Sequence, residues 1–173
     1  MEQVGYDTYC RLLDEVVKEM QGVEVETEQD VQIDMNLSSY IPEEYIENSS
    51  QKIEVYQDIA LSKTEEDLKD VLDELIDRYG QVPEEVHNLI EIARIKQLCK
   101  KANVIKIVQR KENAVFYFDS LKFSTDLVDK IIKKYNNKIK FSPGKEAYIT
   151  LKLENNSDKN VAQEVKKFLL ECK

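Results

Sequence analysis

Residues 64–80, which read TEEDLKDVLDELIDRYG, decide how the middle of this chain folds. Apolar residues recur there at intervals of three and four, the spacing that places side chains on one face of a helix. They are Leu68, Val71, Leu72, Leu75, Ile76 and Tyr79. Thr64, followed three residues later by Asp67, indicates a capping box, and Gly80 is suited to end the helix. The stretch therefore predicts an amphipathic helix that starts after Thr64.

The opposite face of this helix is acidic. Residues 64–79 contain seven acids against Lys69 and Arg78, a net charge of −5. The acids three and four positions apart line one ridge, and like charges at such spacing destabilise a helix by a few tenths of a kcal/mol each. Either the ridge is a solvated face, or it docks a basic partner. The candidate docking residues are Glu74, Asp77, Asp70, Asp73 and Glu66, with Arg78 beside them.

Helical spacing continues on both sides of this segment. Ile53, Tyr56, Ile59 and Ala60 predict a preceding helix. Pro83 suits the first turn of a following one. That third helix carries Val86, Leu89, Ile90 and Ala93 on one face.

The N-terminal part predicts three further segments. Residues 1–22 form an amphipathic helix, residues 23–30 an acidic linker, and residues 31–37 a half-buried strand, because Val31, Ile33, Met35 and Leu37 alternate with polar residues. Pro42 disfavours helix at the residue before it, so residues 38–47 should form a turn or loop.

The last seventy residues predict the order ββαββα. Strands are expected at 104–108, 114–118, 138–141 and 147–153, with a turn at 109–113. Helices should begin after Ser124 and at Ser157, the first with Leu127, Val128, Ile131 and Ile132 inside. The fold class is therefore α+β, a helix-rich N-terminal half joined to a small, mainly antiparallel sheet covered by helices.

Composition indicates a cytoplasmic protein domain. No apolar run approaches the roughly 20 residues of a membrane span, and no signal-peptide pattern begins the chain. The three cysteines, Cys10, Cys99 and Cys172, are far apart, which favours free thiols over a disulfide framework or a zinc site.

No catalytic motif is recognisable, so this chain is not expected to be an enzyme or to hold a cofactor or metal. The phosphate-binding G-x-x-x-x-G-K-[ST] pattern is missing. The single histidine, His87, should lie on the polar side of its helix, paired with Glu84 or Glu91. Among 34 carboxylates, accidental neighbours are certain and indicate nothing.

Charge is divided unevenly along the chain, and this leaves a second hypothesis open. Residues 1–49 carry a net −11, whereas residues 104–173 carry +6. The alternative function is a nucleic-acid-binding module in which Lys133, Lys134, Lys138 and Lys140 contact phosphates. Few exposed aromatic residues are expected among these lysines for base stacking, so weak binding at most is predicted.

Three motifs resemble a known family. Residues 74–83 read ELIDRYGQVP, residues 4–13 VGYDTYCRLL and residues 40–46 YIPEEYI, the last followed by KIEVY at 52–56. In their order along the chain, they resemble the C-terminal regulatory domain of bacterial transcription-repair coupling factors. The resemblance covers residues 4 to about 100; beyond that it lies mainly in the order of the elements.

The resemblance implies a parent that is an ATP- and magnesium-dependent DNA translocase, displaces stalled RNA polymerase and recruits UvrA. Residues 31–173 would be a domain that docks on the parent's UvrB-like module and masks its UvrA-binding surface. Residues 1–22 would end the translocase portion. The family's docking contacts fall on Glu74 and Asp77, the ridge already singled out by its charge.

Overall fold

The computed structural model describes residues 30–172, which form two compact units. The first unit contains residues 37–94, and the second contains residues 30–36 and 95–172. The two units share one helix, α4 (Glu84–Ala102), whose first eleven residues belong to the first unit and the remainder to the second. The expected helix at 1–22 and most of the expected linker at 23–30 lie outside the described residues.

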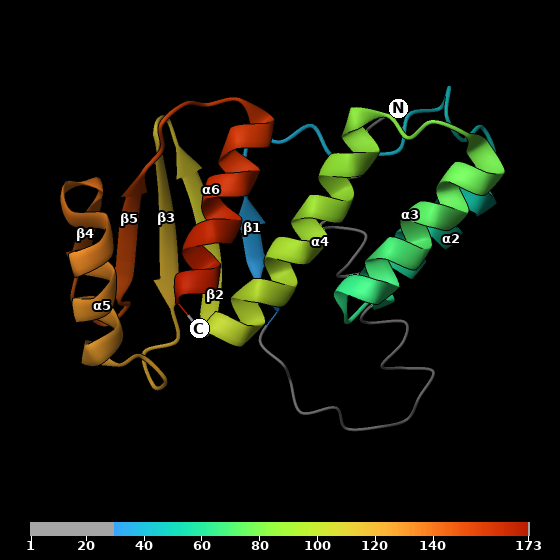
Figure 1. The fold of residues 1–173 in the computed structure, drawn as a ribbon. Helices are drawn as coiled ribbons and strands as arrows, with labels where there is room; N and C mark the ends of the chain where they lie inside the picture. Colours follow the sequence, from blue (N-terminus) through green and yellow to red (C-terminus); the bar gives the residue numbers. More distant parts are fainter. Residues whose placement is uncertain (1–29, 173) are drawn as a thin grey trace. The chain divides into compact units, whose positions relative to one another are not determined.

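Three helices build the first unit: α2 (Ser49–Leu61), α3 (Glu65–Tyr79) and the first part of α4 (Figure 1). All three were predicted from their apolar spacing. Their buried side chains include Tyr56 and Ile59 of α2, Leu68 and Leu75 of α3, and Leu89 of α4. A core shared by three amphipathic helices thus forms this unit.

The connections between these helices follow their sequences. Asn48 caps α2 by accepting hydrogen bonds from the backbone of Ser50 and Gln51. Pro42 begins a tight turn, because its carbonyl oxygen accepts from the backbone N–H groups of Tyr45 and Ile46. Pro83 lies just before α4 rather than inside its first turn, and its carbonyl oxygen accepts from the N–H groups of Val86 and His87.

The second unit contains a five-stranded sheet with the order β1-β2-β3-β5-β4. The strands are β1 (Gln32–Asp34), β2 (Val104–Arg110), β3 (Asn113–Phe118), β4 (Ile139–Ser142) and β5 (Tyr148–Lys152). Helices α5 (Thr125–Tyr135) and α6 (Asp158–Glu171) complete the predicted ββαββα order. Only β1 pairs in parallel, with β2; the other pairings are antiparallel. The α+β fold class is thereby confirmed.

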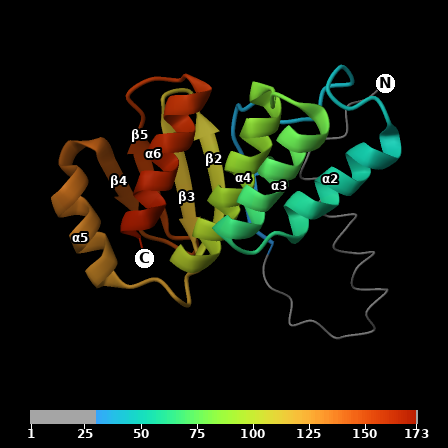
Figure 2. The ribbon, with the colours of Figure 1, turned by 45° about the vertical axis from the view of Figure 1, so that its right-hand side comes forward.

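Helices cover one face of this sheet. Figures 1 and 2 both show α5 and α6 on the same side of the strands. Phe116 of β3 and Phe168 of α6 meet at the centre of this core, with ring centroids 4.3 Å apart and no exposed surface on either. Tyr135 of α5 also packs on Phe168, at 5.6 Å. Large aromatic side chains therefore join sheet and helices into one apolar core.

Several predicted details were wrong. The expected strand at 31–37 is only three residues long, although Val31, Ile33 and Leu37 are buried as predicted. The expected turn at 109–113 is tighter, because residues 109, 110 and 113 belong to strands and only Lys111 and Glu112 connect them. Lys111 has a positive φ of 54°, which suits a two-residue hairpin connection.

Three isoleucines expected on the buried faces of their helices are exposed. Ile53 of α2 is 40% exposed, whereas Val55 and Tyr56 of that helix are buried. Ile76 of α3 is 48% exposed and Ile132 of α5 is 43% exposed. Ile76 and Ile132 each directly follow a buried residue, Leu75 and Ile131 respectively. One step along a helix rotates a side chain by about 100° around the axis, so both isoleucines turn away from the core that their neighbours fill.

Candidate docking surface

Helix α3, which carries the acidic residues, starts at a complete capping box. Asp67 donates its backbone N–H to Thr64 Oγ1 at 3.1 Å, and Asp67 Oδ2 accepts from the backbone N–H groups of Lys63 and Thr64 at 2.9 and 3.0 Å. These two backbone hydrogen bonds, helped by the Thr64 hydroxyl, lower the pKa of Asp67 below its ordinary value. Asp67 therefore stabilises the start of the helix.

The other end of α3 is fixed by a tyrosine from the Pro42 turn. Gly80 ends the helix with a φ of 81°, a conformation that favours glycine. The Tyr45 hydroxyl lies 3.2 Å from the carbonyl oxygens of both Leu75 and Gly80, and its single O–H is shared between these two acceptors. Its ring packs against that of Tyr79, with centroids 5.7 Å apart. Tyr45, from the YIPEEYI motif, thus holds the end of the ELIDRYG helix.

Tyr56, from the KIEVY motif at residues 52–56, holds the loop before α2. The Tyr56 hydroxyl of α2 accepts a hydrogen bond from the backbone N–H of Ile41 at 2.9 Å, in a buried position. Asn88 of α4 donates from its side chain to the backbone carbonyl of Ser38 at 2.9 Å. The loop before α2 is therefore held to the helices by hydrogen bonds that satisfy its backbone.

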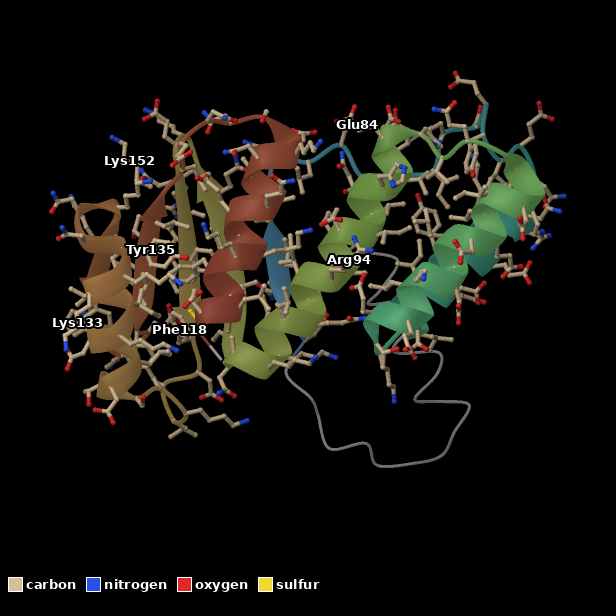
Figure 3. The ribbon with its side chains drawn as sticks, viewed as in Figure 1. Glu84, Arg94, Phe118, Lys133, Tyr135 and Lys152 are labelled. Atoms are coloured by element: carbon tan, nitrogen blue, oxygen red, sulfur yellow. The ribbon has the colours of Figure 1, made fainter. Side chains whose placement is uncertain are left out.

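Arg94 of α4 holds α3 from the other side. Its Nε donates to both carboxylate oxygens of Glu65, at 2.7 and 2.9 Å, and its Nη1 donates to Glu91 at 2.5 Å. Figure 3 shows Arg94 pointing from α4 toward α3. The contact lies on the side of α3 that faces α4, next to the buried Leu68 and Leu75 face.

The seven acids of α3 therefore fall into two groups. Asp67 caps the helix, Glu65 pairs with Arg94, and Glu74 pairs with Arg78 at 3.3 Å. The remaining acids are all exposed, and among the described residues they form no ion pair with a base. They are Glu66, Asp70, Asp73 and Asp77. Their spacing places them in one row along the solvent face, which we call the acidic ridge.

Glu74 lies at the border of the ridge. Its partner Arg78, four residues later, also lies over the Tyr79 ring, 5.3 Å from the centroid. The Glu74 and Arg78 side chains remain 57% and 40% exposed. All six predicted docking residues are thus exposed on α3, and whether they dock a partner stays a prediction.

Helix α2 adds acidic residues beside those of α3. The spacing of acids along α3 could not indicate this, because it involves a second helix. Asp58 of α2 has a pKa raised above its ordinary value, first by partial burial and then by the charges of Glu74 and Glu54, with Arg78 acting in the opposite direction. Carboxylates influence each other in this way only when they are close. The like charges of α2 and α3 therefore gather on one surface.

Two large apolar side chains of these helices are exposed. Ile76 of α3 is 48% exposed, and Leu61, the last residue of α2, is 60% exposed. Helical spacing places Ile76 beside the acidic ridge, and exposed apolar residues next to polar ones are common in interfaces.

The described residues offer no metal site: no group of three or more His, Cys, Asp or Glu residues among them could hold an ion. His87 is exposed as expected, but in this part of the chain it pairs with neither Glu84 nor Glu91; Glu91 instead binds Arg94. Cys99 and Cys172 are buried free thiols, and Cys10 lies outside the described range. No described helix is long and apolar enough to span a membrane.

The lysines singled out for nucleic acid binding are only partly available. Lys134 pairs with Glu171, and Lys138 pairs with Glu154 at 2.8 Å. Lys133 and Lys140 are exposed, and among the described residues neither has an ion-pair partner. Two of these four lysines are therefore already paired with carboxylates.

Comparison with known proteins adds three findings. The family model described as the TRCF domain matches residues 35–127. A transcription-repair-coupling factor of Staphylococcus haemolyticus is 42% identical over 98 residues, which is 56% of this chain and 8% of the relative. That of Rickettsia prowazekii is 31% identical over 171 residues, 98% of this chain and 15% of the relative. The chain thus spans only a small part of these relatives.

A solved structure has a similar fold. It is the C-terminal domain of a transcription-repair coupling factor, and it superimposes with a TM-score of 0.73 at 23% sequence identity. The match covers 83% of this chain and 94% of the other.

Proposed function

The chain belongs to the TRCF domain family of transcription-repair coupling factors, and from this premise we propose that it is a regulatory domain that docks on another part of its parent protein. The observation that carries the proposal is the acidic ridge, four exposed carboxylates on α3 without a basic partner in the described chain.

The energetics favour a docking role over a solvated face. Like charges at three- and four-residue spacing cost helix stability. Partial burial, and after it the charges of Glu74 and Glu54, raise the pKa of Asp58 on the neighbouring α2. A partner that supplies arginine or lysine would remove the repulsion and add charge-assisted hydrogen bonds. Ile76, 48% exposed beside the ridge, supplies an apolar anchor for the same contact.

The resemblance of the sequence motifs supplies the rest of the proposal. The docking partner is the UvrB-like module of the parent, and docking masks the surface that UvrA binds. The parent is an ATP-dependent DNA translocase that displaces stalled RNA polymerase, so ATP and magnesium act elsewhere in the parent. Residues 31–173 restrain it, in the cytoplasm, until docking is released.

Removal of this domain from the full-length parent tests the function. Deletion of residues 31–173 should raise basal ATP hydrolysis and DNA translocation and expose the UvrA-binding surface, because a restraint is lost while no catalytic group is removed. The measurements are steady-state ATPase rates and capture of UvrA. Lower ATPase together with absent UvrA binding would instead make the domain an activator.

A further inference from the structure

The sheet of the second unit has a face that its helices leave open. Cross-strand partners project to the same face, so register assigns each side chain. Phe116 is the cross-strand partner of both Ile107 and Ile149, and all three lie buried on the helix-covered face. The alternate rows form the other face, which we call the open face. Among its residues are Lys106, Arg110, Val115, Tyr117, Lys140, Ser142, Tyr148, Thr150 and Lys152.

Two tyrosines lie side by side on the open face, near one end of strands β3 and β5. Tyr117 of β3 and Tyr148 of β5 are direct cross-strand partners, with ring centroids 5.4 Å apart, and both are half-exposed. Lys106 Nζ lies 5.5 Å from the Tyr117 ring centroid. Neighbouring aromatic rings beside a flexible cation form a surface on which planar, negatively charged ligands can stack. The sequence had indicated few such aromatics near the basic residues.

Basic residues follow the tyrosines along the open face: Lys106 shares their row, Lys140 lies in the next row, and Arg110 and Lys152 lie in the row after that. Arg110, Lys140 and Lys152 are exposed, and Lys106 is half-exposed. Figure 3 shows Lys152 extending outward from β5. One acid, Asp34 of β1, shares the open face, at the edge of the sheet. Thr150 and Ser142 add hydroxyl groups between the lysines. Charge complementarity therefore selects an anionic occupant.

We propose that the open face binds single-stranded nucleic acid, with bases stacked on Tyr117 and Tyr148 and phosphates bound by Lys106, Lys140 and Lys152. A strand is favoured because its unpaired bases can stack on the rings while its phosphates follow the lysines. A duplex hides its base faces, and an acidic peptide would use the charges without needing adjacent rings. This function is separate from docking through α3 and does not depend on it.

The experiment uses the whole 173-residue chain and a fluorescent oligothymidylate of about 16 nucleotides, near the upper end of known site sizes. The Tyr117→Leu/Tyr148→Leu variant keeps apolar side chains on the sheet but removes the rings. It should weaken binding, measured by fluorescence anisotropy, at least about tenfold. The Lys140→Gln/Lys152→Gln variant should reduce the slope of log affinity against log salt by about 1.4, the value for two lost phosphate contacts.

The matched control is Lys133→Gln/Lys159→Gln, which changes the charge equally on helices α5 and α6. Figure 3 shows Lys133 on α5, away from β5. This variant should bind as the unmodified chain does. The proposal is overturned if the strand does not bind, if a duplex of equal length binds as tightly, or if polyglutamate competes as well as the unlabelled strand. Unchanged affinity in a folded tyrosine variant, shown by circular dichroism, would also overturn it.

Discussion

Arg94 of α4 and Glu65 of α3 form a two-point contact, with the arginine Nε 2.7 and 2.9 Å from the two carboxylate oxygens. Helix α4 begins at Glu84, a few residues after α3 ends at Tyr79. The contact therefore joins two helices that follow each other in the sequence. Glu65 is thereby paired with α4, while the four acids of the acidic ridge stay exposed on the face opposite the buried Leu68 and Leu75.

Replacement of Arg94 should weaken the first unit. Arg94→Met keeps much of the apolar stem but removes the hydrogen bonds to Glu65 and Glu91. We expect the free energy of unfolding to fall by about 1–2 kcal/mol, since the contacts are charged but partly solvated. Urea denaturation followed by circular dichroism measures this. Arg110→Met, at an exposed strand position, should stay within about ±0.5 kcal/mol; equal effects in both would contradict the anchoring role.

Charge reversal on α3 should weaken docking. Glu74→Lys/Asp77→Lys places two cations where the proposed partner supplies its own. Ion pairs desolvated in an interface cost roughly 2–5 kcal/mol when one partner is removed. Affinity for the UvrB-like module should therefore drop at least about tenfold, which corresponds to ~1.4 kcal/mol. Isothermal titration calorimetry measures the affinity, and circular dichroism checks the fold.

The control for this reversal must carry the same change in charge. Glu154 is unsuitable because it pairs with Lys138. Asp129→Lys/Glu146→Lys alters two exposed acids of the second unit that have no ion-pair partner among the described residues. Its affinity should be nearly that of the unmodified chain. Equal weakening by both variants would indicate a long-range effect of net charge, and no weakening by the α3 variant would move the interface elsewhere.

The capping box should make α3 sensitive to acid. The pKa of Asp67 is lowered in the folded chain by its backbone hydrogen bonds. A lowered pKa contributes stability above the ordinary carboxyl pKa, and that stability is lost as the pH falls through the folded-state value. Asp67→Asn should therefore be less stable than the unmodified chain at pH 7, and the difference should shrink toward pH 2. Thermal unfolding across this range checks it; a constant difference would contradict it.

Both described cysteines should be unreactive in the folded chain. Burial is the main cause that raises the pKa of both thiols, that of Cys172 to about 12. The thiolate is the reactive form, so little of it exists at pH 8. In a Cys10→Ser variant, a thiol-specific chromogenic reagent should react slowly with the native chain and should find two free thiols after denaturation. Fast reaction of the native chain, or fewer than two thiols, would contradict this.

The sequence alone determined the helices, most of the strands and the acidic ridge. Local signals encode each of these: the spacing of Leu68 and Leu75, the Thr64–Asp67 cap, the glycine at 80 and the run of strand-forming residues at 114–118. Helical geometry then places acids at three- and four-residue spacing on one face without reference to the rest of the chain.

Tertiary structure decided which of those side chains are free and what surrounds them. Arg94 forms ion pairs with Glu65 and with Glu91, the residue that the sequence had suggested as a partner of His87. Asp58 of α2 lies close enough to Glu74 for their charges to interact. Tyr117 and Tyr148 become neighbours only through the pairing of β3 with β5. All of these contacts except the Arg94–Glu91 pair within α4 join different elements of the fold. Such contacts depend on packing and register, which local propensity does not encode.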